Sequence, residues 1–264
     1  MQPSTVNGTE LGAQEWCDTL FLWYDLDPPD LPTYCDGCNT KFTICHALDC
    51  KRGGVITVRH NEICDEVAYL AGKAFTPSHM RDNHLIFAGR SVKRTKATPA
   101  GAIATTDRYR APPPEVMDQK RDLLIPFLWQ NGTDSFHDIR VVNAVAKSHT
   151  SKTLEKCLQE AERGKKRMYL DACLHQHRHF YPFFASVDGL LGVEATTNLK
   201  RLDSRLATKW KQPYSKMCGY VNSRISTSLV RATHRCIRGS WVPAHQISVQ
   251  RTQWEDGAGL NLFR

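Results

Sequence analysis

The sequence contains no apolar run long enough to cross a membrane, because charged residues interrupt every hydrophobic stretch before about 20 residues are reached. Its first residues lack the basic and then apolar layout of a secretory signal peptide. The ten cysteines are therefore expected to stay reduced, since disulfides persist in oxidising compartments. The sequence also shows no internal repeat.

Acidic residues are scarce in the C-terminal third of the chain. Residues 196–238 hold ten Lys or Arg and one acid, whereas the whole chain of 264 residues has a net charge of +8. The excess positive charge therefore belongs to this region, which predicts a surface that faces a polyanion. A merely soluble surface would mix charges of both signs. Four arginines at helical spacing form a possible phosphate track: Arg224, Arg231, Arg235 and Arg238.

Hydrophobic residues make up 41% of the chain, which is enough for a substantial core. Apolar positions at helical spacing predict helices over residues 13–24, 59–75, 151–175, 191–210 and 215–238. Short apolar runs predict strands over residues 85–88, 123–129, 136–142 and 180–187. Residues 90–119 have no steady period and are expected to form a loop. The predicted fold class is α/β, with a small mixed sheet flanked by helices.

Four potential metal ligands lie within sixteen residues near the N-terminus: Cys35, Cys38, His46 and Cys50. The first pair fits the tight turn that holds one side of a tetrahedral Zn²⁺, and a His and a Cys one helical turn apart can close the other side. Cys45 could replace His46 as the third ligand. So compact a motif predicts a structural zinc knuckle. The alternative is a reduced CxxC turn beside an unrelated histidine.

The most informative stretch covers residues 120–143, where two strands are predicted on either side of Asn131-Gly132, a strong hairpin signal. Asp122 opens the first strand and Asp138 lies inside the second, both beside apolar neighbours. A carboxylate beside a core is costly unless it is paired, and two on adjacent strands can share a divalent cation. The plainer alternative is two solvated strand-end carboxylates. Pro126 restricts the first strand to an edge or a bulge.

A lysine interrupts the apolar stripe of the helix that follows the second strand. Leu158 and Ala161 precede Lys165 on this stripe. Such a lysine commonly extends outward to solvent, but this helix should pack across the sheet. Lys165 could therefore steady an attacking water or a phosphate instead. Glu62 and Glu66, one turn apart on an earlier helix, form a solvated face or reach the same metal.

Three features stand in a fixed order: the Cys35–Cys50 knuckle followed by Arg59-His60-Asn61-Glu62, then Arg121-Asp122-Leu123-Leu124 with Asp138-Ile139-Arg140-Val141, and then a helix with Ala161, Lys165 and Tyr169. In this order they resemble the C-terminal region of the polyprotein of non-LTR retrotransposons. There a zinc knuckle follows the reverse transcriptase and precedes a restriction-enzyme-like PD-(D/E)XK endonuclease. The resemblance covers roughly residues 10–264, and no Tyr-x-Asp-Asp polymerase element is present.

The resemblance implies a restriction-endonuclease-like fold and a metal-dependent DNA endonuclease that nicks target DNA to prime reverse transcription. Asp122 and Asp138 would hold Mg²⁺, and Lys165 would supply the lysine of the motif. Arg140 stands where that lysine is usually found, and Lys120-Arg121 precede Asp122 without the usual proline. The implied cofactors are Zn²⁺ and Mg²⁺, the implied partners are DNA and the element's RNA, and the implied location is the nucleus.

The chain is expected to divide into an N-terminal helix and zinc knuckle over residues 1–56, an α/β domain over 57–212, and a basic C-terminal helix and tail over 213–264. The rival hypothesis is a catalytically decayed relic of such an element, which binds nucleic acid and keeps the zinc and the fold. DNA cleavage separates the two hypotheses.

Overall fold

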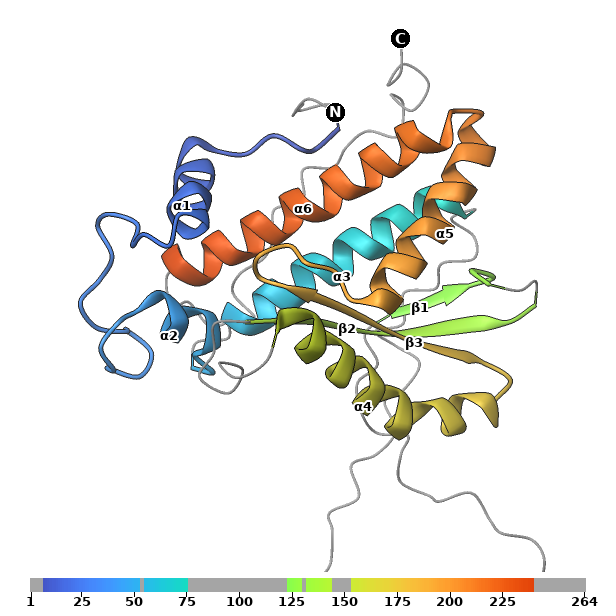
Figure 1. The fold of residues 1–264 in the computed structure, drawn as a ribbon, viewed down its shortest axis with the longest axis horizontal. Helices are drawn as coiled ribbons and strands as arrows, with labels where there is room; N and C mark the ends of the chain where they lie inside the picture. Colours follow the sequence, from blue (N-terminus) through green and yellow to red (C-terminus); the bar gives the residue numbers. More distant parts are fainter. Residues whose placement is uncertain (1–6, 53–54, 76–122, 130–131, 144–152, 240–264) are drawn as a thin grey trace, which may run out of the picture.

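The computed structural model describes residues 7–52, 55–75, 123–129, 132–143 and 153–239 (Figure 1). In chain order these residues form α1 (Ala13–Trp23), α2 (Ile44–Asp49), α3 (Val55–Ala74), β1 (Leu123–Pro126), β2 (Asp134–Val142), α4 (Leu154–Leu174), β3 (His179–Ser186), α5 (Val193–Trp210) and α6 (Tyr214–Arg238). The predicted α/β class is confirmed. No helix in these ranges combines the length and the apolar character needed to cross a bilayer. The strand predicted at 85–88 and the loop predicted at 90–119 lie outside the described residues.

The three strands form one mixed sheet in the order β1-β2-β3. β1 and β2 are antiparallel, with Leu123 opposite His137, and β2 and β3 are parallel, with Asp138 opposite Pro182. α4 makes the crossover that a parallel pair requires. Pro126 and Pro182 both lie on outer strands of this sheet, where a missing N–H group is tolerated.

The predicted hairpin is present, but its connection is longer than two residues. β1 ends at Pro126 and β2 begins at Asp134, opposite each other. Phe127 has a φ of +57°, and its amide donates a hydrogen bond to Thr133 O at 3.1 Å. This hydrogen bond closes the connection next to the two strands, and Asn131 of the predicted turn lies outside the described residues.

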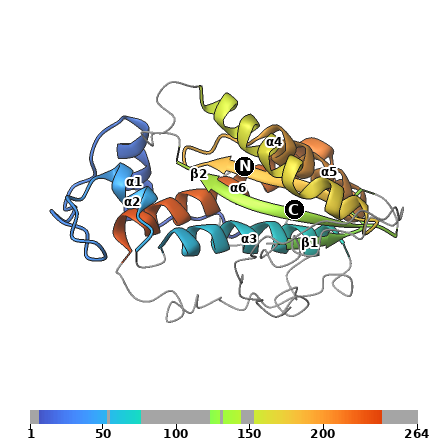
Figure 2. The same cartoon turned by 90° about the horizontal axis from the view of Figure 1, so that it is seen from below.

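The sheet lies between two helical layers, with α4 on one face and α3, α5 and α6 on the other (Figures 1 and 2). The predicted apolar stripes of α3, α5 and α6 are buried and join one hydrophobic cluster with the sheet. Its fully buried members include Leu70, Phe183, Leu202 and Ile225. α6 is therefore continuous with the core of α3 and α5, and the three-part division of the chain stays a prediction.

Several element boundaries differ from those predicted. α3 begins at Val55, four residues before the predicted start. α4 begins at Leu154, three residues after the predicted start, with Thr153 as its N-cap residue. Met168 continues the helical spacing of Leu158, Ala161 and Lys165 but is 59% exposed. The buried part of this stripe therefore does not extend to Met168.

Candidate functional site

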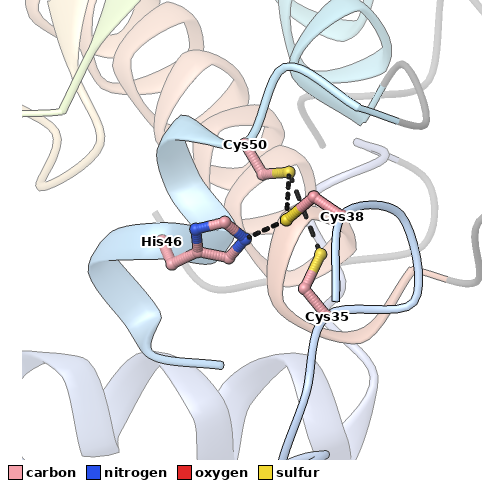
Figure 3. Close-up of side chains that lie close together, drawn as sticks. All are labelled: Cys35, Cys38, His46 and Cys50. Carbon is pink, nitrogen blue, oxygen red and sulfur yellow. Dashed lines mark hydrogen bonds between the residues drawn. The ribbon is translucent and has the colours of Figure 1, made fainter. Parts of the chain in front are cut away.

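The four predicted metal ligands come together as one cluster (Figure 3). Cys50 Sγ lies 3.8 Å from Cys35 Sγ and 3.9 Å from Cys38 Sγ, and Cys38 Sγ lies 3.2 Å from His46 Nε2. All four ligand atoms lie within 4.8 Å of one another. A tetrahedral ion with metal–sulfur bonds of about 2.3 Å places neighbouring sulfurs roughly 3.8 Å apart. The cluster could therefore hold a metal ion, and its donor set fits zinc.

Backbone hydrogen bonds form the turn that carries the first two cysteines. The Asn39 amide donates to Cys35 O at 2.7 Å, and the Cys35 amide donates to Thr40 O at 2.9 Å. Asn39 has a φ of +56°, which asparagine adopts more readily than most residues. Thr43 caps α2, because its hydroxyl accepts a hydrogen bond from the His46 amide at 3.1 Å. The capped helix presents His46 to the cysteine turn.

Cys45, the alternative third ligand, lies outside the cluster. Asn143 Nδ2 donates to Cys45 Sγ at 3.9 Å and to Asp49 Oδ2 at 3.0 Å. Asn143 directly follows β2, so these contacts attach the knuckle to the sheet. Leu48 of α2 belongs to an apolar cluster with Cys236 of α6. The knuckle therefore contacts both the sheet and the last helix, as expected of a motif with a structural role.

The thiols of the cluster differ in how readily they ionise. Hydrogen bonding to Thr40 lowers the pKa of Cys38 to about 6, because it favours the thiolate. Burial raises the pKa of Cys50 to about 11. A bound cation would ionise both, since thiols that ligate a metal are deprotonated.

Asp138 and Lys165 meet on the face of the sheet that α4 covers. Lys165 Nζ donates to Asp138 Oδ1 at 2.8 Å, and the two side chains are 26% and 17% exposed. The same ammonium lies 5.3 Å from the centre of the Tyr169 ring, one helical turn further along α4. The predicted approach of Lys165 to Asp138 is therefore present, and an aromatic ring helps to hold the lysine in place.

This charged pair separates two apolar clusters between α4 and the sheet. The first contains Phe136, Cys173 and Phe180. The second contains Val142, Leu158 and Phe184. A partly buried ion pair contributes little net stability compared with apolar side chains of the same size. Packing alone therefore does not explain a charged pair at this position, which makes it a candidate active site.

The other predicted active-site residues are less well placed. Arg140 lies two residues beyond Asp138 on β2, and its side chain is exposed. Asp122 directly precedes β1 and lies outside the described residues, so the divalent-metal site shared with Asp138 stays a prediction. Within the described ranges, the Cys/His knuckle is the one group of three or more His, Cys, Asp or Glu side chains close enough to hold a metal.

Two arginines of the predicted phosphate track pair with acids of α3. Arg224 donates to both carboxylate oxygens of Glu66, at 2.6 and 2.8 Å, and Arg235 donates to Glu62 at 2.7 Å. Glu62 and Glu66, which the sequence placed either in solvent or near a metal, therefore hold α6 against α3. Their carboxylates accept hydrogen bonds from guanidinium groups of α6.

The other two arginines fix the N-terminal segment to α6. Arg238 donates to both carboxylate oxygens of Asp18, at 2.8 and 2.9 Å, and His234 Nδ1 lies 2.9 Å from the same carboxylate. Burial tends to raise the pKa of Asp18, but these hydrogen bonds lower it below its ordinary value. Arg231 donates to the carbonyl oxygens of Gly8 and Glu10. Nucleic-acid binding by these four arginines stays a prediction, and their guanidinium groups have protein acceptors.

Sequence reasoning missed a buried carboxylate that caps α5 from another helix. Glu162 of α4 is 3% exposed, and its Oε1 accepts a hydrogen bond from the Glu194 amide at 3.2 Å. Burial raises the pKa of Glu162. A Cβ at position 192 would collide with Glu162 Oε1, so a larger residue at the N-cap position of α5 would force the Glu162 carboxylate to move. Glycine before a predicted helix was a readable signal, whereas the cap from α4 was not.

A second missed residue is His137, which neighbours Asp138 but points to the opposite face of β2. It is 1% exposed, and its ring stacks on Tyr181 with centroids 5.9 Å apart. Neither ring nitrogen has a hydrogen-bond partner among the described residues. Burial lowers the pKa of His137 to about 3, so the folded protein keeps a neutral imidazole.

This buried imidazole should make the fold sensitive to mild acid. Below the ordinary histidine pKa of 6.5 the unfolded chain takes up a proton that the folded chain excludes, so stability falls as pH drops from 6.5 toward 3. At pH 5 the loss is about 2 kcal/mol, since one pKa unit corresponds to about 1.4 kcal/mol. Urea unfolding measures the free energy of unfolding at pH 7 and at pH 5. We expect the difference between these two values to be smaller in His137→Leu than in the unaltered protein. An equal difference in both proteins would contradict this role of His137.

Sequence comparisons with known proteins give no family or relative for this chain. No protein-family model matches the chain, and the comparison with curated proteins finds no match. The features of this chain that bear on its function are the knuckle, the Asp138–Lys165 pair and the distribution of charge.

Proposed function

We propose that the chain is the metal-dependent DNA endonuclease domain of a non-LTR retrotransposon, with a restriction-endonuclease-like core and a zinc-bound knuckle. The observation that carries the proposal is the 2.8 Å contact between Asp138, in the middle of β2, and Lys165, from the next helix. A PD-(D/E)XK nuclease needs an acid and a lysine in such proximity. The order of antiparallel hairpin, helix and parallel strand supports the same assignment.

Asp138 and Asp122 would together hold Mg²⁺. Leu123 pairs with His137, and a strand that continued in this register by one more residue would pair Asp122 with Asp138. Magnesium commonly binds one or two carboxylates together with waters and phosphate oxygens of the substrate. Such an ion supplies an activated water and stabilises the leaving oxygen of a phosphodiester.

Lys165 is the residue best placed to act beside that carboxylate pair. Its partly exposed ammonium can donate a hydrogen bond to a phosphate oxygen or orient an attacking water. Tyr169 supports the lysine through its ring, which is a positioning role. Arg140 can contact a phosphate from β2, but it cannot exchange a proton as a lysine can.

The knuckle would hold one Zn²⁺ in a structural role. Three thiolates and one imidazole fill all four positions of a tetrahedral ion: Cys35, Cys38, His46 and Cys50. A catalytic zinc site keeps one position open for water or substrate. The chemistry on DNA is therefore assigned to the sheet, and the knuckle fastens the N-terminal segment to it.

A plasmid-nicking assay tests the proposed activity. The full chain, loaded with zinc, should convert supercoiled plasmid into open circles when Mg²⁺ or Mn²⁺ is added. The matched control omits the added divalent cation, because a chelator would also remove zinc from the knuckle. Nicking that does not depend on the added cation would contradict the proposed metal site.

A second candidate function is nucleic-acid binding without cleavage, as in a decayed relic of such an element. The observation that favours it is that Arg140 occupies the usual lysine position and that Arg121 stands before Asp122 in place of the usual proline. Plasmid binding without nicking under either cation would support this function. The same result would overturn the endonuclease.

A further inference from the structure

α1 is oriented with its apolar stripe pointing away from the protein. Trp16 and Trp23 lie two turns apart on one side of the helix, 48% and 63% exposed. Their rings meet edge to face with centroids 6.5 Å apart. Tyr24 and Leu26 extend this surface beyond the helix end and are 74% and 55% exposed. An amphipathic surface helix ordinarily turns such a stripe toward the core.

The opposite side of α1 explains this orientation, because a charged contact holds the helix. Asp18 is 2% exposed. Its carboxylate accepts hydrogen bonds from Nε and Nη2 of Arg238 and lies 2.9 Å from His234 Nδ1. Arg238 also donates to the carbonyl oxygens of Pro29 and Asp30, in the segment that follows the helix. α6 therefore holds both α1 and the segment at residues 29–30, and the two tryptophans lie on the exposed side of α1.

The segment that carries this surface is acidic, whereas the chain as a whole is basic. Residues 7–50 contain eight acids and one lysine, although the whole chain has a net charge of +8. Asp25 and Asp27 alternate with Tyr24 and Leu26 along the exposed segment. Such a surface repels nucleic acid and anionic membranes and attracts a basic partner.

We propose that Trp16, Trp23, Tyr24 and Leu26, the α1 aromatic surface, bind a basic amphipathic helix of a protein partner. Tryptophan and tyrosine are among the side chains that most often dominate interface energies. The 11-residue α1 presents about 16 Å of apolar stripe, a length suited to a helix packed alongside it. The surface is separate from the Asp138–Lys165 pair, so this inference does not depend on the proposed nuclease.

Two synthetic 18-residue helical peptides serve as probes for this surface. Both carry the same leucine face, and the remaining positions are lysine in one peptide and glutamate in the other. Isothermal titration calorimetry with the zinc-loaded full chain should show at least tenfold tighter binding of the lysine peptide. Affinity should also fall as salt is raised, because the acids contribute through charge. Equal binding of the two peptides would overturn the proposal.

The double variant Trp16→Ala/Trp23→Ala should bind the lysine peptide at least tenfold more weakly than the unaltered chain. Its thermal unfolding should be nearly unchanged, since both rings are largely exposed. Tyr214→Ala is the matched control, an exposed aromatic at the start of α6, and should bind normally. Full affinity in the tryptophan variant, or equal loss in the tyrosine control, would overturn the assignment. Binding of the surface to zwitterionic lipid vesicles instead of the peptide would overturn it as well.

Discussion

Loss of the metal from the knuckle is expected to destabilise the whole fold. Purified protein should contain about one zinc per chain, and Cys35→Ser/Cys38→Ser should contain none, as measured by metal analysis. Structural zinc sites bind with about 10–16 kcal/mol of apparent free energy. A loss of only about 3 kcal/mol of this stabilisation lowers the Tm of a domain of this size by about 6–12 °C. The knuckle contacts both β2 and α6, so its loss should appear in global unfolding.

Cys45→Ser is the matched control for this experiment. Cys45 precedes His46 directly, yet its sulfur contacts Asn143 and lies outside the cluster. The variant should keep its zinc and most of its thermal stability. Metal loss from Cys45→Ser as complete as from the double variant would contradict the ligand assignment. A zinc-free wild-type protein with normal stability would contradict the knuckle altogether.

Features that depend on local spacing could be predicted from the sequence. The knuckle ligands lie within one turn and one short helix, so their convergence follows from covalent proximity. The stripe of α3, with Ile63, Val67 and Leu70, is buried as its period predicted. Lys165 was recognisable because it interrupts an apolar stripe that was expected to pack across the sheet, although extension to solvent was an equal alternative. In each case the residues and the pattern lie on one element, or on two elements that are adjacent in sequence.

Features that depend on pairing between distant elements could not be predicted. The sequence singled out both the arginines of α6 and the acids of α3, yet periodicity does not reveal that Arg224 meets Glu66 across 158 positions. The orientation of α1 has the same origin, since Asp18 is buried only because Arg238 and His234 lie opposite it. A helix therefore turned its polar side inward, against the rule that its apolar stripe implied.

Asp138→Asn is expected to abolish nicking while leaving DNA affinity nearly unchanged. The substitution keeps the shape of the side chain and removes the charge that would hold Mg²⁺. The metal is expected to stabilise the transition state by about 4 kcal/mol, so its loss should slow the reaction by about 10³-fold. Asp122→Ala should have the same effect, because the two carboxylates are proposed to share one ion. Initial nicking rates and filter-binding affinities, measured on the same plasmid, separate rate from binding.

Two neighbouring lysines distinguish a role in the reaction from a general effect of charge. Lys165→Met removes the ammonium at Asp138 and keeps the apolar stem, so nicking should fall by at least about tenfold. Lys166 pairs with Glu194 in the first turn of α5, and Lys166→Met should nick at nearly the normal rate. Equal losses of nicking activity in both variants would show that Lys165 contributes only positive charge and has no specific role in the reaction. If Asp138→Asn still nicked DNA, the proposed active site would be refuted. The proposal gives no other carboxylate of the described sheet the metal-binding role of Asp138.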